Sequence, residues 1–363
     1  MKSDIEQTIR FCQSQDGLRI AYASIGRGPT LVRAAHFFTH IDFDLDSPVW
    51  HPWLVELSRR RQLIRYDGRG CGLSDLDPAP QTLDAWVADL EAVVDAAGLQ
   101  RFALFGCSQG AAIAIDYAVR HPQRVSCLVL LGGYARGPMR RDPTPAQVKE
   151  ARLLVEMIKL GWGRDNPAFR QVFTSLFLPD GSPEQVNWFN ELERLSTSPE
   201  HAARVVAAFG QIDVTASAAR VACPALVLHA RGDARVPFEE GRRMAGLIPG
   251  ARFVPLESRN HVLLENEPAF AQCFGEIQAF LDDHGANPVQ ASAFRNLSPS
   301  ELALLELLAH GLDNLQIAAH LGLAEKTVRN KVSAVFRKLD VGTRAQAIVH
   351  AREAGFGSHP LPA

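Results

Sequence analysis

The chain has 363 residues, 47% hydrophobic and 21% charged, with a formal net charge of −2, which predicts two domains of a soluble globular protein. Residues 1–7 carry charges of both signs, and nowhere do about 18 apolar residues run uninterrupted, which excludes a secretion signal and a membrane span and predicts a cytoplasmic protein. Six cysteines without paired spacing indicate neither a disulfide framework nor a zinc site, and no cofactor is expected.

Three strands are predicted near the amino terminus, over residues 9–14, 19–25 and 30–35. Asp16-Gly17 between the first two is a hairpin signal, so the sheet is expected to open antiparallel. The third strand runs into a polar loop with His36 and His40. Together with His51, these histidines lack regular spacing, which is more typical of a loop than of a metal site.

Strands and helices then alternate. Strands are predicted over 62–66, 101–105 and 125–131, and helices over 83–97 and 111–120. The first of these strands is followed by the glycine-rich loop 67–74. Alternation with continuously apolar strands implies an α/β fold, in which a mostly parallel sheet is covered by helices on both faces.

Ser108 lies in the turn Gly106-Cys-Ser-Gln-Gly110, between a predicted strand and helix. A serine at the apex of such a turn adopts a strained backbone, and its neighbours must be nearly free of side chains, which both glycines satisfy. The turn would expose the serine oxygen with the amide of Gln109 directed at the same space. By itself the pattern also fits a plain tight turn.

Residues 137–219 interrupt the alternation and are predicted to form several helices broken by prolines and glycines. They carry the aromatic residues Trp162, Phe169, Phe173, Phe177, Trp188 and Phe189. These aromatics either line an apolar ligand pocket or only pack this insertion onto the body.

Two further polar residues follow predicted strands. Asp233 comes after strand 225–230, and His261 after helix 238–248 and strand 252–256. Ser108 needs a base because its hydroxyl is a weak nucleophile at neutral pH. His261 would remove the proton, and Asp233 would orient the imidazole and stabilise its charged form.

The order of these segments resembles the α/β-hydrolase fold over roughly residues 10–282. The shared features are the hairpin, the Asp-Gly-Arg-Gly-x-Gly-x-Ser loop at Asp67, the Gly-x-Ser-x-Gly turn, and the later aspartate and histidine. More narrowly, His40-Ile-Asp-Phe-Asp, Gly161-Trp-Gly and 224–233 are similar to hydrolase-like domains attached to bacterial signalling proteins.

The resemblance implies a catalytic triad of Ser108, Asp233 and His261. It also implies an oxyanion hole built from the amides of Phe37 and Gln109, and a lid at about 137–219 over the nucleophile. The chain departs from the family at His36, where hydrolases usually carry glycine beside the oxyanion donor.

The predicted hydrolase-like domain covers residues 1–283 and ends with helix 267–283; residues 284–294 have the composition of a linker, and a second domain covers 295–363. Ser298 and Glu301 form a capping box for helix 299–310. Further helices are predicted over 314–321, 325–339 and 343–354. A short glycine-containing turn joins the second and third helices, as in a helix-turn-helix.

The third helix has one apolar and one polar face. Residues expected to contact DNA are Lys326, Thr327, Arg329, Asn330, Lys331, Ser333 and Lys338. In a major groove Arg329 suits guanine and Asn330 adenine, whereas Thr327, Lys331 and Lys338 suit phosphates. The same residues also fit a merely solvated helix face, because residues 295–363 contain eight Lys or Arg against six Asp or Glu.

This region resembles the LuxR-type DNA-binding domain over nearly its whole length. The resemblance rests on Leu297-Ser-Pro-Ser-Glu301, Gly311-Leu-Asp-Asn314, Ile317-Ala318, Leu321, Thr327-Val328, Lys338-Leu339, Val341 and Arg344-Ala-Gln-Ala347. It implies a four-helix unit whose third helix enters the major groove, with Arg329, Asn330 and Ser333 facing the bases, and whose last helix dimerises. Lys331 stands where the family often has histidine.

The predicted function is a DNA-binding transcription regulator whose hydrolase-like domain senses a small acyl or ester ligand. Its expected partners are double-stranded DNA, the ligand and a second copy of the chain. Two alternatives remain open: an active serine esterase or lactonase that hydrolyses its own inducer, and a hydrolase body that serves only as an oligomerisation module.

Overall fold

The computed structural model describes residues 5–76, 80–285, 294, 297–353 and 356–357. The predicted linker 284–294 falls largely on residues 286–293, which lie outside this range. No helix in the described ranges is long and apolar enough to cross a bilayer.

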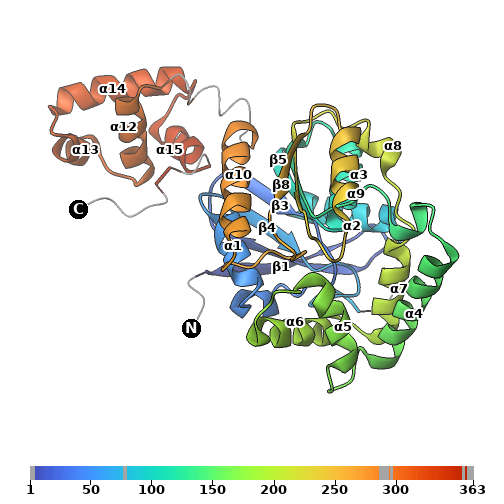
Figure 1. Ribbon diagram of the computed structural model, residues 1–363. Helices are drawn as coiled ribbons and strands as arrows, with labels where there is room; N and C mark the ends of the chain where they lie inside the picture. The colour runs from blue at the N-terminus through green and yellow to red at the C-terminus, as the bar shows by residue number, and fades with distance from the viewer. Residues whose placement is uncertain (1–4, 77–79, 286–293, 295–296, 354–355, 358–363) are drawn as a thin grey trace.

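An eight-stranded sheet forms the body of the first unit (Figure 1). Its strands are β1 (Gln7–Gln13), β2 (Arg19–Ile25), β3 (Thr30–Arg33), β4 (Gln62–Tyr66), β5 (Phe102–Cys107), β6 (Val125–Leu131), β7 (Ala225–Ala230) and β8 (Arg252–Leu256). The spatial order is β1-β2-β4-β3-β5-β6-β7-β8. The hairpin β1–β2 and the pair β2–β4 are antiparallel, and all later pairs are parallel, as predicted.

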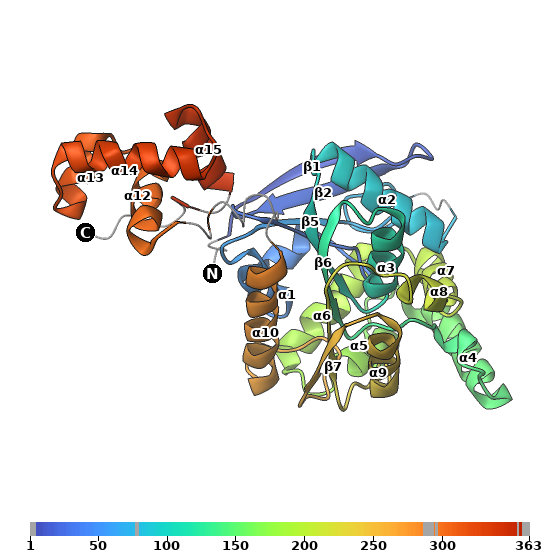
Figure 2. The same ribbon diagram turned by 90° about the horizontal axis from the view of Figure 1, so that it is seen from above.

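Burial explains why the central strands are continuously apolar. Every residue of β5, β6 and β7 is buried, because helices cover both faces of the sheet. These helices are α1 (Trp50–Ser58), α2 (Leu83–Ala96), α3 (Gly110–Arg120), α9 (Phe238–Leu247) and α10 (Pro268–His284). Figure 2 shows α1 and α10 on one face and α2, α3 and α9 on the other.

Helix α1 was not predicted, and the expectation that His51 belongs to a loop is wrong. The Ser47 hydroxyl accepts hydrogen bonds from the amides of Val49 and Trp50, at 3.0 and 2.7 Å, and so satisfies donors at the start of the helix. Pro52 lies in the first turn, where it is tolerated because no intrahelical bond needs its missing N–H.

The insertion between β6 and β7 is helical, as predicted. It contains α4 (Pro145–Gly161), α5 (Ala168–Phe177), α6 (Pro183–Ser196), α7 (Pro199–Phe209) and the short α8 (Thr215–Ala218), drawn mostly in green in Figure 1. The side chains of Thr144, Ser182 and Ser198 cap α4, α6 and α7, and a proline follows each cap. Such Ser/Thr-Pro starts fix where these helices begin. We call residues 137–219 the lid.

Residues 297–353 form four helices with a hydrophobic core of their own. They are α12 (Pro299–Ala309), α13 (Asn314–Leu321), α14 (Glu325–Lys338) and α15 (Arg344–Glu353). The predicted capping box of Ser298 and Glu301 is present, and α13 ends at Gly322 in the left-handed conformation, with φ 63°. The predicted helical unit is therefore confirmed.

Candidate functional site

Ser108 occupies a sharp turn between β5 and α3. Its φ is 55°, a strained value for a residue with a side chain, and its amide donates to the carbonyl of Leu131 on β6 at 3.0 Å. A Cβ on Gly106 would lie 2.6 Å from the Cα of Ala111, and one on Gly110 would lie 3.0 Å from the carbonyl oxygen of Ala35. Gly106 is therefore required for β5 and α3 to approach this closely, and Gly110 allows α3 to lie close to the backbone at Ala35.

Asp233 and His261 meet beyond the ends of β7 and β8. Nδ1 of His261 donates to Oδ2 of Asp233 at 2.7 Å, and both side chains are buried. The backbone amides of Arg235 and Val236 donate to Oδ1 of Asp233, each at 2.8 Å. Burial raises the pKa of Asp233, but His261 and these hydrogen bonds outweigh it and leave the pKa below its ordinary value. The carboxylate is therefore ionised and fixes the imidazole tautomer.

Ser108 and His261 line one small cavity, together with Phe37 and Phe177. Nε2 of His261 is buried and has no hydrogen-bond partner among the described residues. The structure thus brings all three predicted catalytic residues to one place, with Asp233 bonded to His261 and the serine across a shared cavity.

A second cavity, of about 490 Å³, lies beneath the lid and also reaches Ser108. We call it the lid cavity. Its wall is mostly apolar and includes Phe177 and Leu176 of α5, Val155 of α4 and Phe209 of α7. Its volume is that of a typical site for a small organic ligand.

The predicted oxyanion-hole residues, Phe37 and Gln109, both line the lid cavity with Ser108. Their amides donate no hydrogen bond to another protein group within the described ranges. His36 lies next to Phe37 and is buried; its Nδ1 donates to the Phe37 carbonyl at 2.9 Å and its Nε2 accepts from Arg33. Burial, then Arg33, lowers the pKa of His36 well below its ordinary value, so the ring is neutral.

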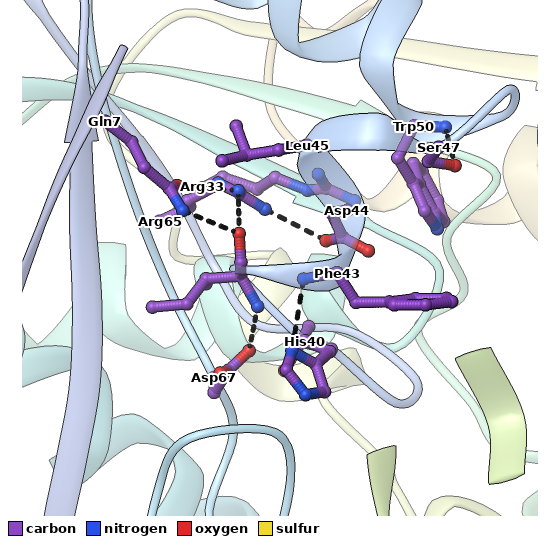
Figure 3. A network of polar contacts seen from close by, with 12 residues as sticks. Gln7, Arg33, His40, Phe43, Asp44, Leu45, Ser47, Trp50, Arg65 and Asp67 are labelled. Carbon is purple, nitrogen blue, oxygen red and sulfur yellow. Dashed lines mark hydrogen bonds and ion pairs between the residues drawn. The ribbon is translucent and has the colours of Figure 1, made fainter. Parts of the chain in front are cut away.

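A buried polar network holds the loop that follows Phe37 (Figure 3). Asp67 accepts from the amides of Ile41 at 2.9 Å and Leu73 at 2.8 Å, and Arg65 pairs with Asp44 at 2.9 Å. Burial raises the pKa of Asp67 to about 7. The glycine-rich loop 67–74 therefore positions the loop at 36–47 rather than lining the lid cavity.

Cys107, beside Ser108, does not compete as a nucleophile. Burial raises the pKa of its thiol to about 12, so the group stays protonated at neutral pH.

Sequence reasoning passed over two residues of the site. The sequence identified Phe177 only as one of six aromatic residues of the lid. Its ring lies 5.5 Å from the ring of His261 and 5.1 Å from that of Phe37. Arg235 entered only as part of the loop after β7, yet it lines the lid cavity. Its position two residues after Asp233, beyond the carboxyl end of a strand, could have indicated from the sequence that it belongs to the site.

Helix α14 buries Val328, Val332 and Val335 and exposes its polar side. The exposed members of the predicted DNA-contacting set are Lys326, Thr327, Arg329, Asn330, Ser333 and Lys338, and Lys331 is partly buried.

Some of these groups already have partners. Arg329 pairs with Glu325 at 2.8 Å, and Lys338 pairs with Glu301 at 2.7 Å. Lys331 bonds to Ser300. Lys331 and Lys338 therefore tie α14 to α12.

Residues 43–268 match the family model described as the alpha/beta hydrolase fold, which is more than half of the chain. The chain belongs to this family. Residues 295–351 match the model for bacterial regulatory proteins of the luxR family, so an α/β-hydrolase domain is fused to a LuxR-type DNA-binding domain.

Relatives and solved structures agree on the hydrolase part. A protein named carbamate hydrolase RutD from Klebsiella pneumoniae is 29% identical over 218 residues, covering 58% of this chain and 79% of that protein. YisY of Bacillus subtilis, of the AB hydrolase superfamily, is 26% identical and covers 69% of this chain and 91% of its own. An esterase from Exiguobacterium antarcticum has the same fold, with a TM-score of 0.64, 23% identity, and 75% and 98% of the two chains covered.

Proposed function

We propose that this α/β-hydrolase protein is a transcription regulator in which a small acyl or ester compound binds in the lid cavity and changes the affinity of the LuxR-type domain for DNA. One observation carries the proposal. A ligand-sized cavity reaches Ser108, at the sharp turn or elbow between β5 and α3, in the same chain as a DNA-binding domain. A ligand can act in this way only if it binds two conformations of the protein with different affinity.

For the bound ligand we assign roles by position. Ser108 would contact the carbonyl carbon, with the amides of Phe37 and Gln109 donating to the carbonyl oxygen. If the ester is cleaved, Oγ of Ser108 attacks the carbonyl carbon, its proton passes to Nε2 of His261, and the alcohol leaves as that proton is returned. Water, deprotonated by the same imidazole, then attacks the acyl-serine; the acid leaves and the proton returns to Oγ. The Asp233 carboxylate stabilises the imidazolium in between.

For DNA we assign base contacts to Arg329, Asn330 and Ser333, which are exposed on one side of α14. Lys326 and Thr327, also exposed at the start of the helix, are placed for phosphates. Lys331 and Lys338 would have to leave Ser300 and Glu301 to contact phosphates. We infer that the chain acts as a homodimer, as its LuxR-type domain suggests.

Covalent occupation of the cavity tests the regulatory proposal. The full-length protein is treated with an alkyl fluorophosphonate beside Ser108→Ala, and intact mass reports the adduct. Duplexes selected from a random library then give DNA affinity with and without the adduct. We expect one adduct on wild type alone and a change in DNA affinity of about fivefold or more. An adduct that leaves DNA affinity unchanged contradicts sensing through this cavity.

A second function, active hydrolysis, is favoured by the hydrogen bond between His261 and Asp233 at 2.7 Å. It predicts turnover of acyl esters or lactones that both Ser108→Ala and His261→Ala abolish. A folded wild-type protein that takes up no fluorophosphonate excludes it. If Ser108→Ala and substitutions in the wall of the lid cavity all leave regulation untouched, the hydrolase body acts only as an oligomerisation module.

A further inference from the structure

The charged side chains that line the lid cavity differ in whether they have a hydrogen-bond or ion-pair partner. Three ionisable side chains of Arg, Lys, Asp, Glu or His type line it: Arg141, Glu150 and Arg235. Arg141 donates to the carbonyl of Arg136 at 2.7 Å and lies 3.6 Å from the carboxylate of Glu240. Glu150 is exposed on α4. Arg235 is the residue whose charge remains to be explained.

The guanidinium of Arg235 makes no hydrogen bond or ion pair within the described ranges. It lies over the ring of Phe177, 5.8 Å from the centroid. The carboxylate of the nearby Asp233 accepts hydrogen bonds from His261 and from two backbone amides, and none from the Arg235 guanidinium. Burial lowers the pKa of Arg235 and outweighs the opposing influence of Tyr134 and Asp233, as expected for a cation partly removed from water without an ion pair.

An unpaired cation in an apolar wall weakens the empty protein, because the charge loses hydration and gains no ion pair. Sites kept in spite of such a cost are characteristic of ligand binding. A guanidinium presents a planar fork of N–H groups that matches a carboxylate with two parallel hydrogen bonds.

We propose that the ligand of the lid cavity carries a carboxylate that pairs with Arg235, in addition to the acyl carbon placed at Ser108. The inference rests on the proposed function for the location of the acyl group. The ring of Phe177 lies 5.8 Å from the guanidinium of Arg235 and 5.5 Å from the ring of His261, so the carboxylate lies on the same aromatic wall as the reacting group. One free guanidinium among apolar residues suits a single negative charge and disfavours a phosphate dianion.

Monomethyl and dimethyl esters of succinate, adipate, suberate and sebacate test this charge requirement. Within each pair the two molecules differ only in whether the second acid is free. Binding is measured by calorimetry on the full-length Ser108→Ala protein, in which the esters cannot be turned over. We expect the best-fitting monoester to bind about tenfold or more tightly than its diester, the effect of one charge-assisted hydrogen-bonded pair.

Arg235→Gln, added to this protein, is expected to abolish the preference. Arg231→Gln is the matched control, since Arg231 lies in the same loop, over the ring of Phe238 at 5.2 Å, but pairs with Glu257 at 2.7 Å and does not line the cavity. It should keep the preference. Arg235→Lys should retain part of the preference for the monoester. Because the unpaired charge weakens the empty protein, Arg235→Gln should unfold at the same temperature as its parent or at a higher one.

Equal affinity for mono- and diesters, binding of neither, or a preference that survives Arg235→Gln would overturn the inference. An equal loss in Arg231→Gln would assign the preference to net charge and also overturn it. Because this binding assay involves no DNA, the proposed function can fail separately. An Arg235-dependent preference together with DNA affinity insensitive to the ester would refute regulation while the carboxylate site stands.

Discussion

Phe177 joins the lid to the loop that carries His261, and its truncation should destabilise the hydrolase domain. Its carbonyl accepts hydrogen bonds from the amides of His261 at 3.0 Å and Val262 at 3.2 Å. Its ring packs against Phe37 at 5.1 Å and Phe189 at 5.5 Å, and the residue is 3% exposed. The end of α5 is thus fixed to the loop that carries His261.

Replacement of a core phenylalanine by alanine costs about 3–5 kcal/mol. Phe177 lines both the small cavity and the lid cavity, so part of its ring already lacks neighbours. We therefore expect Phe177→Ala to lower the free energy of unfolding by about 2–4 kcal/mol, below the value for a fully packed core. The backbone hydrogen bonds to the His261 loop survive the substitution.

Urea unfolding followed by tryptophan fluorescence measures this loss. All five tryptophans lie between residues 50 and 188, so the signal reports the hydrolase domain alone. Val172→Ala is the control on the same helix; the residue is 41% exposed, and the change should stay within about 0.5 kcal/mol. A loss below about 1 kcal/mol for Phe177→Ala, at unchanged m-value, would show that the ring does not hold the lid to the loop.

Three further predictions concern DNA, pH and the elbow. Arg329→Ala should reduce the discrimination at one base position by about 1–3 kcal/mol of DNA-binding free energy, measured in competition assays. Glu325→Ala should leave the base preference intact. An equal loss of affinity for all duplexes would indicate that Arg329 contacts phosphate instead. Burial raises the pKa of Asp67 from 3.8 to about 7, so its contribution to stability is full below pH 3.8 and is lost as pH rises through about 7. Wild type should therefore lose stability relative to Asp67→Asn over that window, and parallel pH profiles from urea titrations would contradict this. Gly106→Ala should lower the free energy of unfolding by about 1–3 kcal/mol, because the added Cβ would lie 2.6 Å from backbone atoms. Gly246→Ala is the control and should cause no such loss, because a Cβ there has no tertiary neighbour within 4 Å among the described residues. Equal urea midpoints for the two variants would argue against the close approach at Gly106.

Much of the fold was predictable because its signals are local. Strands β2, β4, β6, β7 and β8 begin and end where the sequence predicted. Most are short, largely apolar runs with polar, glycine or proline residues at or beside their ends, and such boundaries depend on nearby residues alone. Helix α1 was not predicted. Pro52 by itself argues against a helix, and only the hydrogen bond from the Trp50 amide to Ser47 shows that the proline falls in the first turn.

The sequence by itself determined the alternation of strands and helices, the elbow at Ser108, and the order in which aspartate and histidine follow later strands. Only the tertiary structure decided which groups have partners. It paired His261 with Asp233 and Lys338 with Glu301, and it left Arg235 in the lid cavity without an ion pair to any residue that the structure describes. The physical reason is that backbone periodicity and turn chemistry act over a few residues, whereas a contact between distant side chains depends on how the whole chain packs.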